Sequence, residues 1–150
     1  MKGSESYLKM WKASKNYSAG VNIARTGTAS ANWYERSIFT NFKPGQANDG
    51  SAKTRWASGW SDNEWWQVDL GSTRQVSRVA IEWESAYGKG YKIQTSHNGS
   101  TWTTVAVVTN GNGGLDTVKL TNASGRYIRM QGVKRATKYG YSIKEFSAFS

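Results

Sequence analysis

The chain has 150 residues, a formal net charge of +10 at neutral pH and no cysteine. This length fits one domain with a single core, and the lack of cysteine excludes disulfides, thiolate metal sites and a cysteine nucleophile. The excess of positive charge permits nucleic acid, anionic lipid or acidic polysaccharide as a partner, and it gives no information about the fold. No apolar run approaches the roughly 18 residues of a membrane-spanning helix.

The first twenty residues are polar and read as a recombinant start followed by an incoming linker. We therefore expect the domain itself to occupy residues 21–150. No signal peptide is visible at the start. A secreted parent protein would carry its signal further upstream.

The next elements along the chain have the composition of β-strands separated by turn signals. The segments are residues 64–70, 75–84, 91–96, 102–108, 116–120, 126–133 and 142–149. Val79, Ile81 and Trp83 alternate with polar or small residues, which predicts one buried and one wet face. Short strands at this spacing favour an antiparallel sandwich or barrel.

The segment from residue 22 to 61 lacks such patterns and contains the only proline, Pro44. We expect it to form a long ordered loop on the β scaffold. Long ordered loops of this kind commonly carry function.

Catalytic motifs are missing from the sequence. The only histidine, His97, lies beside the Asn98-Gly99 turn, and there is no nucleophile elbow, histidine pair or P-loop. Glu82 and Glu84 share a strand face; a carboxylate pair is the catalytic alternative that stays open. We predict that the chain is not an enzyme.

Several motifs in order resemble the discoidin (coagulation factor 5/8 type C) domain, and more narrowly the bacterial family 32 carbohydrate-binding modules. They are "NIARTGTAS", "ANDGSAKTRWAS", "EWWQVDLGSTRQVSRVAIEWESAYGKGYKIQTSHNGSTWTTV", "GRYIRM" and "ATKYGYSIKEF", which together span about residues 21–150. The resemblance implies an all-β fold, an eight-stranded antiparallel jelly-roll sandwich. It also implies a non-catalytic, monomeric module of a larger, secreted polysaccharide-degrading enzyme. The absence of a disulfide favours the bacterial branch.

The resemblance places the sugar site in loops at one end of the sandwich. A sugar needs one or two exposed rings and a few fixed polar groups. By resemblance, Trp60 and Tyr139 stack on the sugar, Arg55 donates hydrogen bonds, and Glu84 and Glu35 accept them. Trp33 or Tyr34 could take the place of Glu35. Alternatives are a structural salt bridge for Arg55 and a chance exposed ring for Trp60. Tyr141 is expected to pack into the sandwich edge.

A structural calcium ion is also implied by the resemblance. Calcium takes six to eight oxygen ligands, many of them carbonyls of a loop. The expected ligands are the carboxylates of Asp49 and Glu145, the hydroxyl and carbonyl of Thr54, and the carbonyls of Gln46, Ser51 and Phe146. The alternative is that Asp49 only forms a turn and Glu145 is a solvated charge.

The identity of the glycan stays open, with an acidic polysaccharide of the alginate or pectin type preferred. That preference rests on basic residues that flank the site motifs, namely Lys53, Lys89, Lys134, Arg135 and Lys138. Glu84 and Glu35 instead suit a neutral β-glucan, a galactoside or chitosan. A different class would be a membrane- or protein-binding discoidin domain, with Trp33-Tyr34 and Ile38-Phe39 at its loop tips. No nucleic-acid recognition motif is present.

Overall fold

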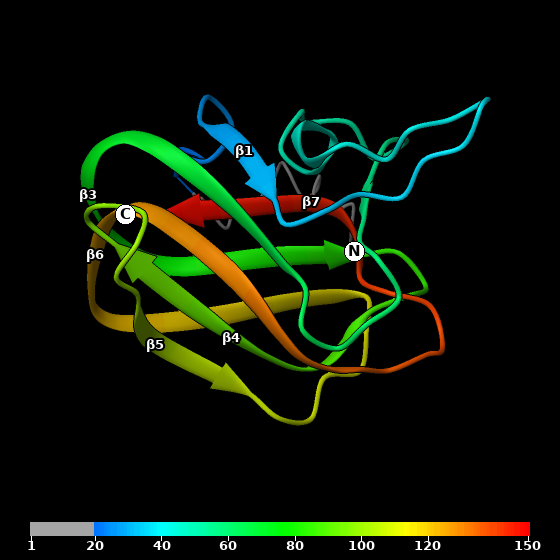
Figure 1. The fold of residues 1–150 in the computed structure, drawn as a ribbon. Coiled ribbons are helices and arrows are strands. Elements are labelled where there is room, and N and C mark those ends of the chain that lie inside the picture. The colour runs from blue at the N-terminus through cyan, green and yellow to red at the C-terminus, as the bar shows by residue number, and fades with distance from the viewer. Residues whose placement is uncertain (1–19) are drawn as a thin grey trace.

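The computed structural model describes residues 20–150, so the predicted linker, Gly20 apart, lies outside the described residues. Its elements in chain order are β1 (Thr28–Ala31), the 3-10 helix η1 (Pro44–Ala47), β2 (Trp56–Ala57), β3 (Trp65–Trp83), β4 (Gly88–Ser96), β5 (Thr103–Val108), β6 (Leu115–Arg135) and β7 (Ser142–Phe149), as Figure 1 shows. Within this part of the chain no helix has the length and apolar character to cross a membrane.

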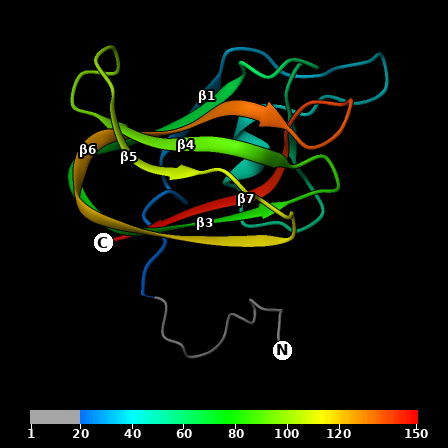
Figure 2. The same ribbon diagram turned by 90° about the horizontal axis from the view of Figure 1, so that it is seen from below.

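The two longest strands, β3 and β6, bend and take part in both layers of a sandwich (Figure 2). Residues 65–69 of β3 pair with β1 and with residues 127–131 of β6, and β4 and β5 continue this layer. Residues 78–82 of β3 pair with β7 and with residues 115–119 of β6, and β2 continues that second layer. The pairing of β3 with β6 shifts register between Asp69 and Arg74, around Gly71, whose φ is +89°. Glycine tolerates this positive φ without strain.

The core lies between the layers and is made by alternate residues of the paired strands. Its largest fully buried side chains are Trp56, Trp66, Tyr91, Tyr141, Phe146, Ile81, Ile93, Ile128, Met130, Ile143, Val68 and Val79. Trp66 packs on Phe146 across the layers, with ring centroids 4.7 Å apart. Burial of this much apolar surface is the main stabilising contribution to the fold.

The predicted all-β antiparallel sandwich is confirmed, but the strand count differs from the expected eight. Segments predicted as separate strands join into single bent strands, because the turns between them are bulges that keep the chain in the sheet. The segment from 22 to 61 is not one loop: it contains β1 and β2. These strands are too short for their sequences, TASA and WA, to show a period.

Candidate functional site

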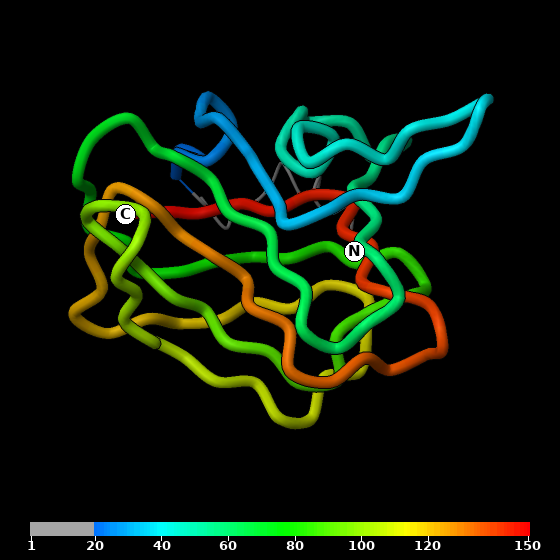
Figure 3. The backbone as a smooth tube through the Cα atoms, in the orientation of Figure 1, coloured from blue at the N-terminus to red at the C-terminus, as the bar shows by residue number. Residues whose placement is uncertain are grey.

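Four segments that are far apart in the sequence meet at one end of the sandwich. Three backbone hydrogen bonds join them side by side: Glu35 N to Ala57 O at 2.8 Å, Ser58 N to Tyr141 O at 2.9 Å, and Glu84 N to Ser142 O at 2.9 Å. The Cα trace shows the loop around residues 35–42 extending well beyond the strands at this end (Figure 3). The segments that carry Glu35, Trp60, Glu84 and Tyr139 are therefore brought together.

Four exposed aromatic rings lie at this end, and one of them, Phe39, is 87% exposed in the loop after Glu35. Trp33, Trp60 and Tyr139 expose 45%, 58% and 46% of their surface. Trp60 and Tyr139 meet edge to face, with centroids 5.2 Å apart and planes at 82°. A cavity of about 430 Å³ is lined by Trp33, Glu35, Gly59 and Trp60. Exposed ring faces beside a cavity are suited to the C–H patches of a sugar ring.

Gly140 allows the two aromatic loops to pack against each other. A Cβ at this position would lie 2.2 Å from the carbonyl oxygen of Gly59 and 2.3 Å from Oγ of Ser58. The tyrosines on either side differ accordingly: Tyr139 is partly exposed, whereas Tyr141 is fully buried and donates to the Asp62 carbonyl at 2.7 Å. Burial raises the pKa of Tyr141, so its hydroxyl remains a donor.

Besides Asp62, three glutamate carboxylates lie in the segments that form this end. Within residues 20–150, the Glu35 carboxylate makes no hydrogen bond or ion pair. Glu84 accepts hydrogen bonds from Ser85 Oγ at 3.0 Å and from the backbone of Ala86 at 3.3 Å. Glu35 is therefore free to accept a hydrogen bond or ion pair from a ligand.

The third carboxylate, Glu64, was missed by the sequence analysis. It is buried and accepts hydrogen bonds from Gly59 N at 3.0 Å, Ser61 Oγ at 2.6 Å and Asn32 Nδ2 at 3.1 Å. It thus fixes the loop that carries Trp60. Glu64 is the first residue of the strand predicted at 64–70, and nothing in the sequence sets it apart from an ordinary strand-end charge.

The basic residues expected around the site have different partners. Arg135 pairs with Asp62 at 2.8 Å and donates to the carbonyls of Trp60 at 3.0 Å and Lys138 at 3.1 Å. It therefore ties the two aromatic loops together, and its hydrogen bond lowers the pKa of Asp62. The ammonium of Lys138 lies 5.4 Å from the Tyr139 ring centroid. Because its guanidinium is bonded to Asp62, Trp60 and Lys138, Arg135 has a structural role.

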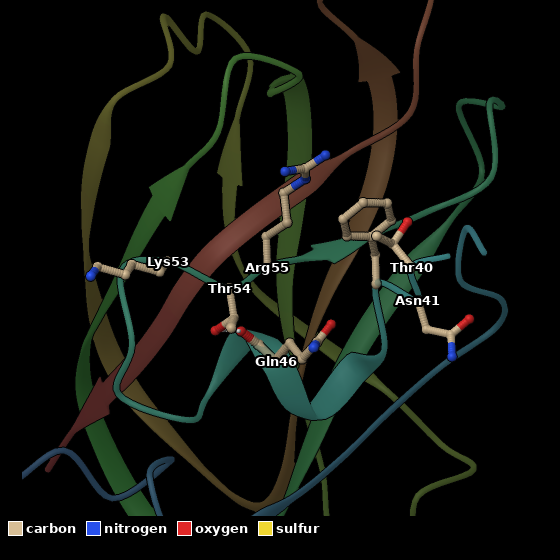
Figure 4. A pocket seen from close by; sticks show the side chains of 7 residues that line it. Thr40, Asn41, Gln46, Lys53, Thr54 and Arg55 are labelled. Atoms are coloured by element: carbon tan, nitrogen blue, oxygen red, sulfur yellow. Dashed lines mark hydrogen bonds between the residues drawn. The ribbon is translucent and has the colours of Figure 1, made fainter. Parts of the chain in front are cut away.

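The other basic residues differ in position: Lys134 is close enough to Asp62 to help lower the pKa of its carboxyl, and Lys89 lies between the β4 residues that pair with Arg135 and Lys134. Lys89 donates to Asn110 at 2.8 Å. Arg55 and Lys53 line a second cavity, and the Arg55 guanidinium lies 4.2 Å from the Phe42 ring centroid. Arg55 is one of the five residues expected to bind the sugar. It lines this second cavity (Figure 4), and Trp60 does not.

The loop expected to hold calcium gathers oxygen atoms around Thr54. Its hydroxyl lies 2.6 Å from Asp49 Oδ2 and 3.4 Å from each of the carbonyl oxygens of Gln46 and Ser51. Glu145 on β7 accepts from Gly50 N at 3.2 and 3.1 Å, which brings its carboxylate to the same loop.

Burial, and then the nearby Asp49 charge, raise the pKa of Glu145 to about 8, against the lowering effect of the Gly50 hydrogen bond. A cation would relieve this repulsion. Within residues 20–150 no cluster of three or more acidic, histidine or cysteine side chains could hold a metal. Carbonyls and the Thr54 hydroxyl would have to complete the coordination, which suits calcium. Phe146 follows Glu145, with its ring in the core.

The comparisons with known proteins decide the family. The sequence profile described as "NedA-like, galactose-binding domain", of the F5/8 type C group, matches residues 46–130. The chain belongs to this family. The predicted discoidin resemblance is confirmed, and with it the reading of the chain as a non-catalytic carbohydrate-binding module.

Several solved structures similar to this chain are carbohydrate-binding modules. Chitosan-binding module 1 of a chitosanase/glucanase from Paenibacillus sp. IK-5 is 40% identical, with a TM-score of 0.80 over 87% of this chain and 99% of that one. Module 2 of the same enzyme, in complex with chitotriose, is 36% identical, with a TM-score of 0.80 over 86% and 100%. The family 32 module of NanJ from C. perfringens, in complex with galactose, is 26% identical, with a TM-score of 0.74 over 86% and 98%.

A curated relative is the polysaccharide lyase 8 family protein HylA of Enterococcus faecalis, 28% identical over 131 residues. The match covers 82% of this chain but only 9% of the lyase. The chain thus corresponds to a small part of that enzyme, as an attached module does.

Proposed function

We propose that the domain binds an amino-sugar glycan of the chitosan type and holds an attached extracellular polysaccharide-degrading enzyme on it. The observation that carries this proposal is the edge-to-face pair of Trp60 and Tyr139 beside the unpaired carboxylate of Glu35. The rings offer apolar faces to the sugar, and the carboxylate offers an acceptor for an ammonium group. The module acts as a monomer within a longer enzyme.

The charged residues near the aromatic cavity favour an amino-sugar glycan over the acidic polysaccharide that was preferred from the sequence alone. Glu35 lines the aromatic cavity, and Glu84 lies on a neighbouring segment. Arg135, expected to attract an acidic ligand, is neutralised by Asp62. A carboxylate ligand would therefore meet like charge at the aromatic cavity, whereas glucosamine would meet opposite charge. The chitosan-binding modules at 40% and 36% identity support the same choice.

The test is a titration calorimetry comparison of chitosan trimer with its fully N-acetylated counterpart. The two trimers have the same backbone and differ in their positive charges. We expect the amine form to bind more tightly, and Glu35→Gln to remove most of this preference while leaving the acetylated form unchanged. Tighter binding of the acetylated form, or an equal loss of both in Glu35→Gln, would contradict the proposal.

An acidic polysaccharide is the second candidate, favoured by the exposed Lys138 next to Tyr139. Its binding would weaken as ionic strength rises, because salt screens the long-range attraction of a +10 domain for a polyanion. Alginate and laminarin trimers titrated at low and high salt check this. If alginate alone binds, with salt dependence, then the second candidate replaces the first.

We also propose that calcium binds among Asp49, Thr54 and Glu145, with carbonyls of Gln46, Ser51 and Phe146. The convergence of oxygen atoms on Thr54 supports this, as do the burial of Glu145 and the nearby Asp49 charge, which raise the pKa of the Glu145 carboxyl. A bound calcium would neutralise the two carboxylates and hold the loop against β7. Its role is structural, and the loop residues supply the ligands.

A further inference from the structure

The outer face of the layer that contains β1, β4 and β5 carries a stacked group of side chains away from the aromatic cavity. The guanidinium carbon of Arg129, on β6, lies 4.0 Å from the ring centroid of Trp65 and 4.0 Å from that of Trp102. Trp65 begins β3, whereas Trp102 stands in the turn between β4 and β5. Both rings are partly exposed. Three separate segments thus hold one cation at a fixed place on the surface of the sheet.

This stack lies along the strands and not in the loops of the sugar-binding end. β4 starts at Gly88, near the segment that carries Glu84, and its arrow in Figure 1 points away from the end with the long loop. Arg129 pairs with Gln94, which at the usual rise of a strand is about 20 Å along β4 from Gly88. The turn that carries Trp102 follows the far end of β4.

The groups around the Arg129 guanidinium are donors that lack acceptors. Its Nε and Nη2 donate to Oε1 of Gln67 at 3.1 and 2.7 Å, which leaves Nη1 without a partner within residues 20–150. Because Gln67 uses its oxygen in these bonds, its amide N–H₂ is left to donate elsewhere. The ring N–H groups of Trp65 and Trp102 also have no partner in this part of the chain. The face therefore suits a ligand that is rich in acceptors.

The charge on this face is positive. Burial lowers the pKa of Arg129, and among residues 20–150 no carboxylate pairs with it. Lys92 on β4 adds a second cation on the same side of the sheet. Asp69 is the one acidic residue in the parts of β3, β4 and β6 that form this layer, and both of its oxygens accept from Arg126, at 2.8 and 3.0 Å. Charge complementarity therefore favours an anionic ligand.

We propose that the face around Arg129, Trp65 and Trp102 is a second glycan-binding surface, which takes a uronate unit of an acidic polysaccharide. The uronate carboxylate meets the Nη1 side of the guanidinium, whose plane is fixed by the two rings. The ring N–H groups and the Gln67 amide donate to sugar hydroxyls. Lys92 attracts the neighbouring uronates of the chain. The surface does not depend on which glycan the aromatic cavity takes.

The test follows indole and backbone N–H signals by NMR while alginate trimer is added to the full chain. We expect saturable shifts of the Trp65 and Trp102 indole signals and of the amides at residues 127–131. Laminarin trimer has no carboxylate and should not shift these signals. The absence of saturable shifts with alginate trimer, or shifts confined to the Trp60 loop, would overturn the proposal.

Replacing the central cation should weaken binding most. Arg129→Gln should weaken binding of alginate trimer about tenfold or more, because charge-assisted hydrogen bonds are lost. Lys92→Gln leaves the stack intact and should weaken binding less. The matched control is Lys119→Gln, which makes the same change on β6 in the other layer, where Lys119 pairs with Arg78. We expect the control to bind as the wild type does. An equal loss in Lys92→Gln and Lys119→Gln would show only general charge attraction and would overturn the proposal.

Chitosan trimer separates this surface from the proposed function. Arg129→Gln should leave binding of chitosan trimer intact, which also shows that the variant is folded. If Arg129→Gln does not fold, Lys92→Gln decides, and unchanged alginate binding in it would refute the surface. Trp60→Ala should remove chitosan binding and retain alginate binding. If it removes alginate binding as well, alginate binds at the aromatic cavity and the second surface is refuted.

Two further outcomes distinguish the possible ligands. If chitosan trimer does not bind the wild type while alginate trimer binds at Arg129, the proposed function fails and the second surface stands. A glutamate trimer carries carboxylates without sugar rings and should bind much more weakly than alginate trimer. If it shifts the Trp65 and Trp102 indole signals with equal affinity, the surface recognises anionic peptides as well as glycans, and the proposal of a glycan surface fails.

Discussion

Tyr139 and Tyr141 are separated by one glycine, yet one exposes 46% of its surface and the other none. Tyr141 lies beside Trp83 in the core, with centroids 6.4 Å apart, and donates its hydroxyl to the Asp62 carbonyl. Tyr139 meets Trp60 at the surface. Tyr139 lies in the bend that precedes β7, whereas Tyr141 stands just before β7 begins at Ser142, so a single motif supplies both an exposed ring and a core residue.

The same contrast holds for the tryptophans. The ring N–H groups of the buried ones are bonded: Trp56 to Trp33 O at 3.1 Å, Trp66 to Pro44 O at 2.9 Å and Trp83 to Asp116 Oδ2 at 2.9 Å. Within residues 20–150 the ring N–H of Trp60 has no such partner. Buried rings thus satisfy their polar tip inside the fold, and the exposed ring keeps both its face and its donor for a ligand.

The largest expected effect is a loss of folding stability when the buried tyrosine, Tyr141, is replaced. Tyr141→Ala should reduce the free energy of unfolding by about 3–5 kcal/mol, as for other large core rings. Tyr139→Ala should change it by no more than about 0.5 kcal/mol, since it removes an exposed ring. Urea unfolding followed by tryptophan fluorescence measures both. Similar losses in the two variants would show that Tyr139 also supports the core.

Calcium removal should come next, because the loop proposed to bind calcium is joined to β7 by the hydrogen bonds from Gly50 N to the Glu145 carboxylate. Calcium at about 100 times its Kd should stabilise the fold by about 2.7 kcal/mol relative to the chelated protein. Asp49→Asn should reduce this gain, and Asp116→Asn serves as an acidic control away from the loop. Thermal unfolding with calcium and with chelator measures it. An unchanged melting temperature, together with no bound metal, would refute the calcium proposal.

The pH dependence of the metal-free protein sharpens the same test. The pKa of Glu145 is raised from 4.5 to about 8 in the fold, so between these values the folded chain holds a proton that the unfolded chain has released. Its stability should therefore fall as pH rises through this window. Calcium needs the ionised carboxylate, so its affinity should rise with pH and offset the fall. Melting curves at pH 5 and pH 8, with and without calcium, check the sign; a metal-free protein more stable at pH 8 would contradict it.

Smaller changes are expected when the exposed ring of Trp60 is removed, and they affect the free energy of sugar binding rather than that of unfolding. Trp60→Ala should weaken binding of chitosan trimer by about 1–3 kcal/mol, the order of burying an aromatic face. The unfolding free energy should stay close to that of the wild type. Calorimetry and urea unfolding of the same sample separate the two effects. Retained binding would place the sugar away from Trp60.

The smallest effects come from the hydroxyl groups of the two tyrosines. Tyr141→Phe should reduce stability by about 1 kcal/mol, because it leaves the Asp62 carbonyl without this donor. Tyr139→Phe keeps the stacking ring and should change neither stability nor trimer binding by more than about 0.5 kcal/mol. A large loss of binding in Tyr139→Phe would show that its hydroxyl contacts the sugar.

Much of the fold was accessible from the sequence, and parts of the site were not. Alternation at Val79, Ile81 and Trp83 predicted the buried face of β3, since its period follows directly from strand geometry. Trp65 and Trp102 hold Arg129 between them on the outer face, each ring centroid 4.0 Å from the guanidinium carbon, whereas Trp56 and Trp66 are fully buried. Composition cannot separate these uses, because an apolar ring suits either position.

The sequence by itself determined the all-β class, the family, the lack of catalytic motifs and the oxygen-rich loop around Asp49 and Thr54, because each depends on local pattern or motif order. The tertiary structure alone decided which charges are free. It pairs Arg135 with Asp62, buries Glu64 beneath the Trp60 loop and leaves the Glu35 carboxylate without a partner among residues 20–150. A charge acquires its role from partners brought close by folding, and these can lie far along the chain, as Asp62 does 73 residues before Arg135.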